Sequence, residues 1–479
     1  MSQAAAAPRA TRDHVLIAIS AALALSRILA VSAPQGANDR SRWATVVALV
    51  EHGTYAIGQR LRSSRGPLDL GLVEALDLRT VDRVLHPQRQ RFYSSKPTLL
   101  PTMVAAEYAL LRALFGWQLQ RDSKKVVVVV LLTFNWLPLL LYLLLFERLL
   151  RRHCHEPWVR SFVMGCACFA TFVTSFVVTL NNHTVATYGV MAALYLLATL
   201  DARPAARRGS TVAIAGLCAG WAASADLPAT ALCVALAVLL ARRDLRLTLV
   251  WFVPAAVLPV GAQLLTNVLA IGTVKPAYYH ASWYRYAGSY WLRRRGVDRV
   301  EPSRLRYALH FLVGHHGVLS LSPMYLLSLL GGRGTGLRDG LLAGLLAAGT
   351  FVFGLTYRRY GVVWVTVVPL CAALFIAPLW RAERTLQAAF RQLVLVCSVS
   401  TLAFYIASTD SYGGIAIGPR WLIWLTPLWL LAMIPAAQRW AARGTLGKGA
   451  MLALGALSAW SSQRSPLDPW QHPWLYGLL

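Results

Sequence analysis

The chain has 479 residues, of which 57% are hydrophobic and 14% charged, so no soluble domain could hide its apolar surface from water. Apolar stretches recur at about 20 residues, the length that crosses a bilayer core, and helices satisfy their own backbone hydrogen bonds in lipid, so we expect an all-α, polytopic transmembrane bundle forming one domain over 1–479. The excess of Lys and Arg over Asp and Glu, 47 against 20, predicts contact with membrane lipids, and without a basic polar domain it excludes nucleic acid as a partner.

Thirteen apolar stretches predict membrane spans, and basic clusters fall mostly on one side of them, which the positive-inside rule assigns to the cytoplasm. The other side, exoplasmic or periplasmic if the chain lies in the inner cell membrane, receives two long loops, 34–125 and 272–315. The stretch 99–115 is nearly apolar enough to cross, but it contains Glu107 and Arg112, so we expect it to be re-entrant or interfacial. The thirteen spans cover 15–33, 126–147, 161–180, 185–200, 210–225, 227–241, 247–271, 316–331, 340–356, 361–379, 392–408, 421–438 and 449–462.

The loop 34–125 contains amphipathic segments, Trp43–Glu51 and Leu70–Val84, which predict short helices lying along the membrane surface. Asp39 follows closely on the first span, and an ionised carboxylate so near hydrocarbon is costly unless it is paired or functional. Arg40 and Arg42 are available as its partners. The alternative is that Asp39 only caps the interfacial helix that begins here.

The same loop carries the segment Tyr93-Ser94-Ser95-Lys96-Pro97-Thr98-Leu99. Pro97 can begin a helix in its first turn, which places the Lys96 ammonium beside free backbone donors, a setting that suits a phosphate. The alternative is a lysine that only extends from an interfacial helix to the lipid headgroups.

Together, Asp39-Arg40-Ser41-Arg42-Trp43-Ala44 and the Tyr93–Leu99 segment resemble the first exoplasmic loop of the GT-C superfamily of membrane glycosyltransferases. The resemblance is closest to the branch of the lipid A aminoarabinose transferase and the dolichyl-phosphate-mannose protein mannosyltransferases. It implies a GT-C-like enzyme of the hexosyltransferase class that moves a sugar from a polyprenyl-phosphate donor to a lipid, glycan or protein acceptor in the cell envelope, with inversion. Asp39 would then be the catalytic carboxylate, and Lys96 would bind the phosphate.

Departures from the family pattern bear on the cofactor. Arg40 stands where the family has a second acid, which weakens a two-carboxylate metal site and leaves the metal unassigned, with a divalent ion as one candidate. By position in the motifs, Arg42 and Tyr93 are expected to contact substrate. His183 stands where the resemblance leads us to expect another acid, and it is either a proton acceptor or metal ligand near the site or a structural residue.

Later exoplasmic segments add further candidates. Aromatic residues crowd the loop 272–315, where they either form an interfacial belt or pack on sugar rings. One of two adjacent histidines, taken as His315, is expected to line the site. Arg420 ends a Gly-rich loop and is a second candidate for the lipid phosphate, unless it only reaches headgroups. Asp226, before Pro228, is expected to be a helix cap rather than a catalyst.

Two other functions stay open at the level of the sequence. A transporter or flippase for a lipid-linked sugar would also need many spans and cations, but it would more naturally carry ionisable residues in mid-membrane and repeated halves. A GT-C relative without catalysis is the other possibility, because the second acid is absent.

Overall fold

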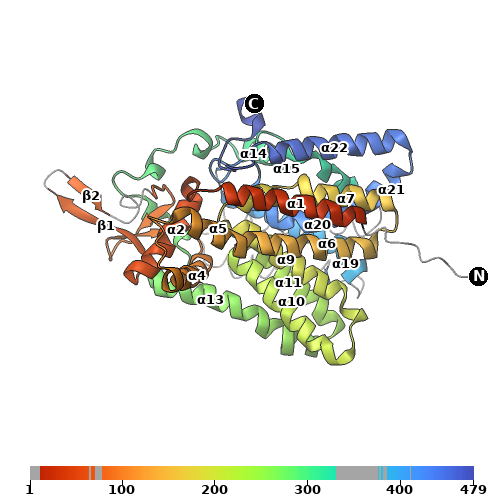
Figure 1. Ribbon diagram of the computed structural model, residues 1–479, viewed down its shortest axis with the longest axis horizontal. Coiled ribbons are helices and arrows are strands. Elements are labelled where there is room, and N and C mark those ends of the chain that lie inside the picture. Colours follow the sequence, from red (N-terminus) through yellow and green to blue (C-terminus); the bar gives the residue numbers. More distant parts are fainter. Residues whose placement is uncertain are drawn as a thin grey trace, which may run out of the picture.

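A computed structural model of the chain describes residues 11–63, 66–70, 78–330, 376, 379–380, 386–409 and 411–478. Within these residues the fold is mostly helical: long helices run side by side, and the strands and several short helices gather at one end, on the left of Figure 1. Five helices are long and apolar enough to cross a membrane, or six if one bent pair forms a single span. Thirteen spans are therefore not confirmed, and 340–356 and almost all of 361–379 lie outside the described residues.

The first half of the chain supplies most of the long helices. The helices up to Arg243 are α1 (Thr11–Ala30), α2 (Gly36–His52), α4 (Leu99–Phe115), α5 (Ser123–Leu131), α6 (Leu137–His153), α7 (Pro157–Phe169), α8 (Phe172–Ser175), α9 (Asn182–Ala198), α10 (Ala205–Ala225) and α11 (Thr230–Arg243). A π-helical turn, Leu132–Trp136, joins α5 to α6, so that the two elements form one candidate span over Ser123–His153.

The second half contains more interrupted helices. The helices after Arg243 are α12 (Leu245–Leu247), α13 (Val253–Ile271), α14 (Arg304–Leu312), α15 (Val318–Leu321), α16 (Leu326–Leu330), α19 (Leu386–Ser408), α20 (Thr426–Ala432), α21 (Ile434–Ala441) and α22 (Thr445–Gln463). The predicted span 316–331 is divided into α15 and α16, because Pro323, which begins a 3₁₀ turn between them, has no backbone N–H to donate. The pair α20 and α21, together with the 3₁₀ turn Arg420–Leu425, is the bent candidate span.

Helix α10 packs closely against α13 through two glycines one turn apart. A Cβ atom at Gly216 would collide with the carbonyl of Phe252, and one at Gly220 with the carbonyl of Ala256. Small residues at four-residue spacing let helix backbones approach in lipid, where water supplies no hydrophobic drive between helices.

We expect Gly220→Leu to destabilise the bundle, because the new side chain must push α13 away from α10. Overpacking of this kind costs about 1–3 kcal/mol. The matched control is Gly261→Leu, a glycine within α13 whose added Cβ would meet no atom within 4 Å. A thermal melt of the purified protein should fall for the first variant and stay near wild type for the second. Equal melts would contradict the close α10–α13 contact.

The first long loop folds into a helix and a sheet. Strands β1 (Ala56–Ser63), β2 (Gly66–Leu70), β3 (Arg83–Leu85) and β4 (Arg91–Ser94) pair antiparallel in the order β2-β1-β4-β3. The predicted helix Trp43–Glu51 lies within α2, but the helix expected over Leu70–Val84 is wrong where the segment is described, because both ends are strands. Pro87 sits in the tight turn between β3 and β4, where a helix could not continue.

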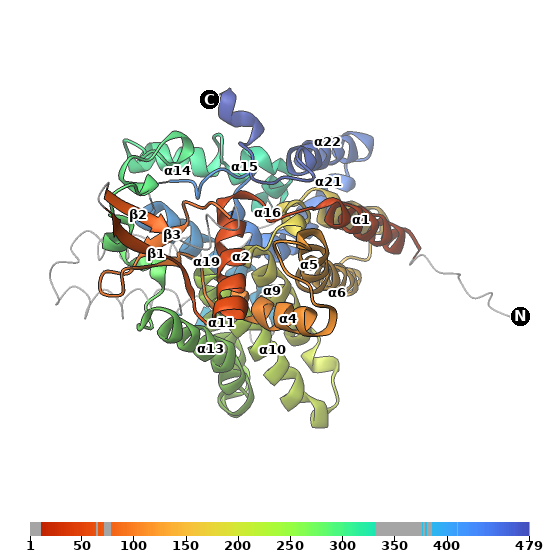
Figure 2. The same ribbon diagram turned by 60° about the vertical axis from the view of Figure 1, so that its left-hand side comes forward.

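Helix α4, which covers the ambiguous stretch 99–115, is a 17-residue helix beside α2 at the sheet end of the bundle. It is not among the candidate membrane spans, and its re-entrant or interfacial placement stays a prediction. Figure 2 shows α2 and α4 together between the sheet and the long helices.

The loop 272–315 covers the sheet. It consists of short 3₁₀ turns followed by α14, and its aromatic side chains dock on the strands. Trp291 Nε1 donates to the Val81 carbonyl at 2.7 Å, and the ring of Tyr286 lies 5.1 Å from that of Phe92 in β4. The two long loops therefore form one cap over the same end of the bundle.

Candidate active site

Asp39 lies in the first turn of α2 and is buried, with 2% of its surface exposed. One carboxylate oxygen accepts the backbone N–H of Gln35 at 2.8 Å, and the other accepts the N–H of Leu180 at 3.0 Å. Burial raises the pKa of Asp39 to about 7, although these two amides oppose the shift. The carboxylate is thus held in place by two segments far apart in the chain, and it titrates near neutral pH.

Arg42 follows one helical turn later and is also buried. Its Nη1 donates to the carbonyl of Asn38 at 2.9 Å and to the Asn38 side chain, and its Nη2 donates to the Asn182 side chain at the start of α9. Burial, and after it the charge of Arg420, lower the pKa of Arg42 to about 10. Arg42 therefore fixes α2 against α9 while contributing a positive charge.

Lys96 stands between β4 and α4, as the motif predicts. Its Nζ lies 2.9 Å from Oδ1 of Asp82, just before β3. Burial lowers the pKa of Lys96 to about 8 despite the opposing charge of Asp82. Ser41 of α2 donates to the Asp82 carbonyl at 2.6 Å and shares a 2.7 Å hydrogen bond with Ser94, so the pair is anchored to the helix that carries Asp39.

Arg420 reaches the same region from the far end of the sequence. It is buried, its Nε donates to the Gly413 carbonyl at 3.1 Å, and its guanidinium lies 5.4 Å from the centre of the Trp470 ring. The charge of Arg420 lowers the pKa of both Arg42 and Lys96, so these cations act on one another electrostatically. Such a cluster is a site for a doubly or singly charged anion.

His183 is paired with an acid. Its Nδ1 lies 2.6 Å from Oδ2 of Asp226, and both side chains are buried. Asp226 occupies the predicted cap position of the 3₁₀ turn Leu227–Ala229, but its side chain makes no cap hydrogen bond and pairs with His183 instead. Sequence reasoning missed this role because 43 residues separate the two, and only the pairing of α9 with α10 brings them together.

The other two predicted residues lie elsewhere. Tyr93, on β4, is buried in a small apolar cluster with residues such as Ala270 and Ile271, at the contact between the sheet and α13. His315 belongs to a cluster of histidine and tyrosine rings; His310 stacks on it at 4.1 Å and Tyr412 meets it edge-on at 4.9 Å. Burial lowers the pKa of His315 to about 4. The structure brings together Asp39, Arg42, Lys96, His183 and Arg420, and it leaves these two outside that group.

Two acids that the sequence did not single out face the cations. Asp82 is one, and Asp298 of the loop 272–315 is the other; its Oδ2 accepts the Tyr290 hydroxyl at 2.9 Å. Burial raises the pKa of Asp298, and the Arg420 charge opposes the shift. The signal for Asp82 was its place opposite Ser94 and Lys96 in a β-hairpin, in which Arg83 pairs with Ser94.

The carboxylates do not form a metal site in the part of the chain that the structure describes. No group of three or more His, Cys, Asp or Glu side chains there could hold a metal ion. Asp39 is engaged by two amides, Asp82 by Lys96 and Asp226 by His183. These residues do not fit a bound metal, and their chemistry is that of a buried carboxylate beside cations.

Trp470 of the C-terminal segment fills the space at the start of α2. A Cβ atom at Gly36 would collide with its indole ring, and Gly36 also has a positive φ of 61° that only glycine adopts easily. The same ring lies 5.6 Å from Phe176 and under Arg420. Residues from three distant parts of the chain thus define the position of the first turn of α2.

The described residues form a helical bundle with candidate membrane spans, and the end that carries the sheet holds the buried carboxylate of Asp39 and the cations Arg42, Lys96 and Arg420. No family model matches the sequence, and no curated protein matches it. Solved structures do. The oligosaccharyltransferase AglB of Archaeoglobus fulgidus, in complex with an inhibitory peptide and a dolichol-phosphate, matches 96% of this chain and 56% of its own, at 11% identity and a TM-score of 0.44.

A second similar structure is that of ArnT from Cupriavidus metallidurans. Its apo structure covers 93% of this chain and 63% of the ArnT chain, at 15% identity and a TM-score of 0.44. Its structure bound to undecaprenyl phosphate covers 94% of this chain and 77% of the ArnT chain, at 15% identity and a TM-score of 0.35. AglB and ArnT are both members of the GT-C superfamily. The chain spans about half the length of the AglB chain.

Proposed function

We propose that this protein is a membrane glycosyltransferase that moves a sugar from a polyprenyl-phosphate carrier to an acceptor hydroxyl. The observation that carries the proposal is that α2 holds the buried Asp39 and Arg42 and also bonds, through Ser41, to the Asp82 that pairs with Lys96, while the charge of Arg420 acts on both Arg42 and Lys96. A lipid phosphate needs cations at the membrane surface, and a hydroxyl nucleophile needs a base. In this proposal the cations and the base both lie at one end of the bundle, beside α4 and the aromatic loop.

The chemistry is a single displacement. Asp39 accepts the proton of the acceptor hydroxyl as the oxygen attacks the anomeric carbon, and the bond from that carbon to the phosphate oxygen breaks with inversion. The leaving polyprenyl phosphate gains a negative charge. Lys96 and Arg420 stabilise that charge, which is electrostatic catalysis by groups already in place before the reaction.

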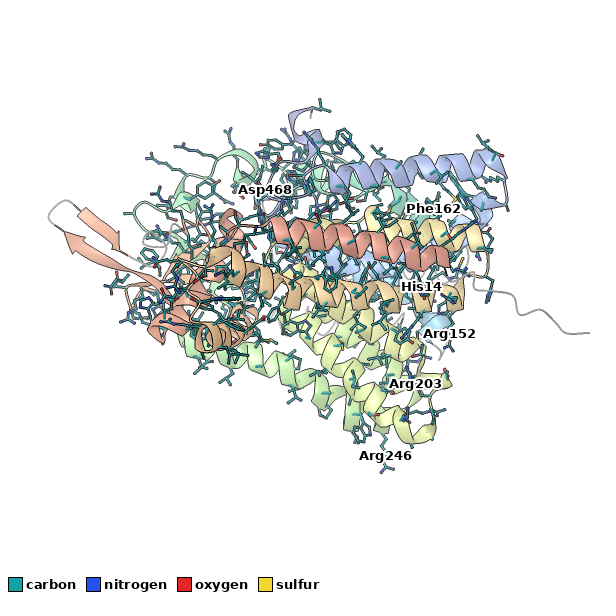
Figure 3. All side chains as sticks on the ribbon, in the orientation of Figure 1. His14, Arg152, Phe162, Arg203, Arg246 and Asp468 are labelled. Carbon is teal, nitrogen blue, oxygen red and sulfur yellow. The ribbon has the colours of Figure 1, made fainter. Side chains whose placement is uncertain are left out.

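The orientation follows from the distribution of cations. Arg152, Arg203 and Arg246 gather at the end of the bundle opposite to the sheet, as Figure 3 shows. By the positive-inside rule, we propose that this end faces the cytoplasm and that the candidate site lies on the exoplasmic, or periplasmic, face of the inner membrane. The aromatic rings of the loop 272–315 would then cover a donor that enters laterally from the bilayer.

The test is transfer of radiolabelled sugar from a panel of polyprenyl-phosphate sugars to membrane acceptors, with donor binding measured in parallel. Consumption of one donor by the wild-type protein supports transfer. Binding of a donor without consumption across acceptor preparations would reject transfer and favour a carrier-binding protein, either a transporter or an inactive relative. Both Asp39 oxygens already accept hydrogen bonds from backbone amides, so donor binding without consumption has a structural basis.

We expect kcat/KM to follow a bell-shaped pH profile. Asp39 must be ionised to act as a base, so the rate rises as the pH passes its pKa of about 7. Lys96 must be protonated to bind phosphate, so the rate falls above its pKa of about 8. Because kcat/KM reports the free enzyme, these values apply before donor binds. A profile that is flat from pH 6 to 9 would exclude both assignments.

A further inference from the structure

A cavity of about 210 Å³ lies between the ends of several helices, away from the candidate active site. Helix α9 spans the distance between them: its first residue, Asn182, contacts Arg42 at the site, and its last residue, Ala198, lines the cavity. A helix of this length is about 25 Å long. The cavity therefore serves neither Asp39 nor the cations around it.

The lining of the cavity is mostly apolar. Each helix contributes residues spaced by one turn, so that they share a face: Leu149 and His153 on α6, Leu194 and Ala198 on α9. Ile434 and Gln438 of α21 are likewise four residues apart. His153 and Gln438 supply the polar groups. The walls suit a hydrocarbon chain rather than a polar metabolite.

Exposed arginines are the sequence neighbours of residues that line the cavity. Arg148 and Arg152 precede Leu149 and His153 on α6, so they form the neighbouring stripe of that helix, and both are exposed. Arg439 follows Gln438 and is also exposed. Figure 3 shows Arg152 at the end of the bundle opposite to the sheet. An apolar cavity bordered by cations at a membrane surface is complementary to a lipid with a negatively charged head.

The geometry points to a second lipid site in this cavity, which takes one acyl chain of an anionic phospholipid while Arg148 and Arg152 bind its phosphate. The site is independent of the proposed transferase reaction. The bound lipid would hold the ends of α6, α9 and α21 together at the membrane surface. It would belong to the leaflet that surrounds these helix ends. A guanidinium pair of this kind selects a net negative headgroup over a zwitterionic one.

The test uses the full chain in neutral detergent, titrated with phosphatidylglycerol or phosphatidylcholine, with bound lipid counted by native mass spectrometry. Four proteins are compared with wild type: Leu194→Trp and Ala198→Phe, which fill the cavity, the double variant Arg148→Gln/Arg152→Gln, and the matched control Arg203→Gln/Arg246→Gln. The control removes two arginines from the same end of the bundle without touching the cavity.

We expect wild type to prefer phosphatidylglycerol, and the cavity and headgroup variants to bind it about tenfold more weakly, while the control binds as wild type does. The proposed site would be overturned if wild type bound the two lipids equally, or if the control lost as much phosphatidylglycerol binding as the cavity and headgroup variants. Either result would indicate a general basic surface. Polyprenyl phosphate that displaces phosphatidylglycerol from this cavity would overturn the choice of occupant. If Leu194→Trp does not fold, Ala198→Phe and the surface arginine variant still decide the matter.

Discussion

Asp39→Asn is expected to lower kcat for sugar transfer by about a thousandfold while the donor still binds. Removing a positioned general base typically costs 10²–10⁴ in rate. The amide keeps the shape of the carboxylate but cannot take the proton of the acceptor. The measurement is single-turnover transfer with saturating donor, alongside donor affinity, because the two together separate chemistry from binding.

The structural role of Asp39 needs its own control. An asparagine has one acceptor oxygen where the carboxylate serves the amides of both Gln35 and Leu180, so the variant also leaves one buried N–H without a partner. A purely structural residue would therefore lower the melting temperature, donor binding and transfer together. A base would lose transfer and the ascending limb of the pH profile near 7, with donor binding retained. Transfer at the wild-type rate would end the catalytic assignment.

The local motifs of the first loop were predictable because their chemistry lies in short segments. The interfacial helix expected over Trp43–Glu51 is present but begins earlier, at Gly36, so Asp39 and Arg42 lie one turn apart within α2. Lys96 precedes Pro97 at the junction of β4 and α4, as its sequence suggests. In both cases a few neighbouring residues fix the geometry.

Contacts over long separations were not predictable in the same way. Asp82 meets Lys96 only because β3 and β4 form a hairpin, and three-residue and four-residue strands leave too short an alternation to be recognised. Asp226 meets His183 only because α9 and α10 pack side by side. His315 shows the reverse case: its place at a predicted span boundary suggested the site, but its ring stacks on His310 and meets Tyr412 edge-on instead.

Lys96→Met is expected to weaken binding of polyprenyl phosphate by about 10- to 100-fold, and binding of the sugar-linked donor by less. Hydrogen bonds to charged groups contribute about 1.5–3 kcal/mol. The free polyprenyl phosphate carries more negative charge than the donor phosphate, so it loses more when the ammonium is removed. The same difference predicts a fall in kcat, because the lost interaction is strongest with the leaving group.

The chain offers a matched lysine–aspartate pair as control. Lys96 lies 2.9 Å from Asp82 with side-chain exposures of 16% and 13%, whereas Lys125 lies 3.0 Å from Asp122 with exposures of 59% and 10%. Lys125→Met should leave lipid-phosphate binding unchanged, since that pair is largely solvated. If both variants weaken binding equally, the effect is one of overall charge, and Lys96 is no phosphate ligand.

Asp82→Asn is expected to change the binding of polyprenyl phosphate in the direction opposite to Lys96→Met. In the unliganded protein Asp82 competes with phosphate for the Lys96 ammonium, and its own charge repels the ligand. Removing that charge should therefore tighten polyprenyl phosphate binding. The double variant Lys96→Met/Asp82→Asn leaves no unpaired buried charge, so it separates loss of the ligand contact from loss of fold. Weak binding by the double variant with a normal melting temperature would mean that Lys96 acts on the phosphate directly.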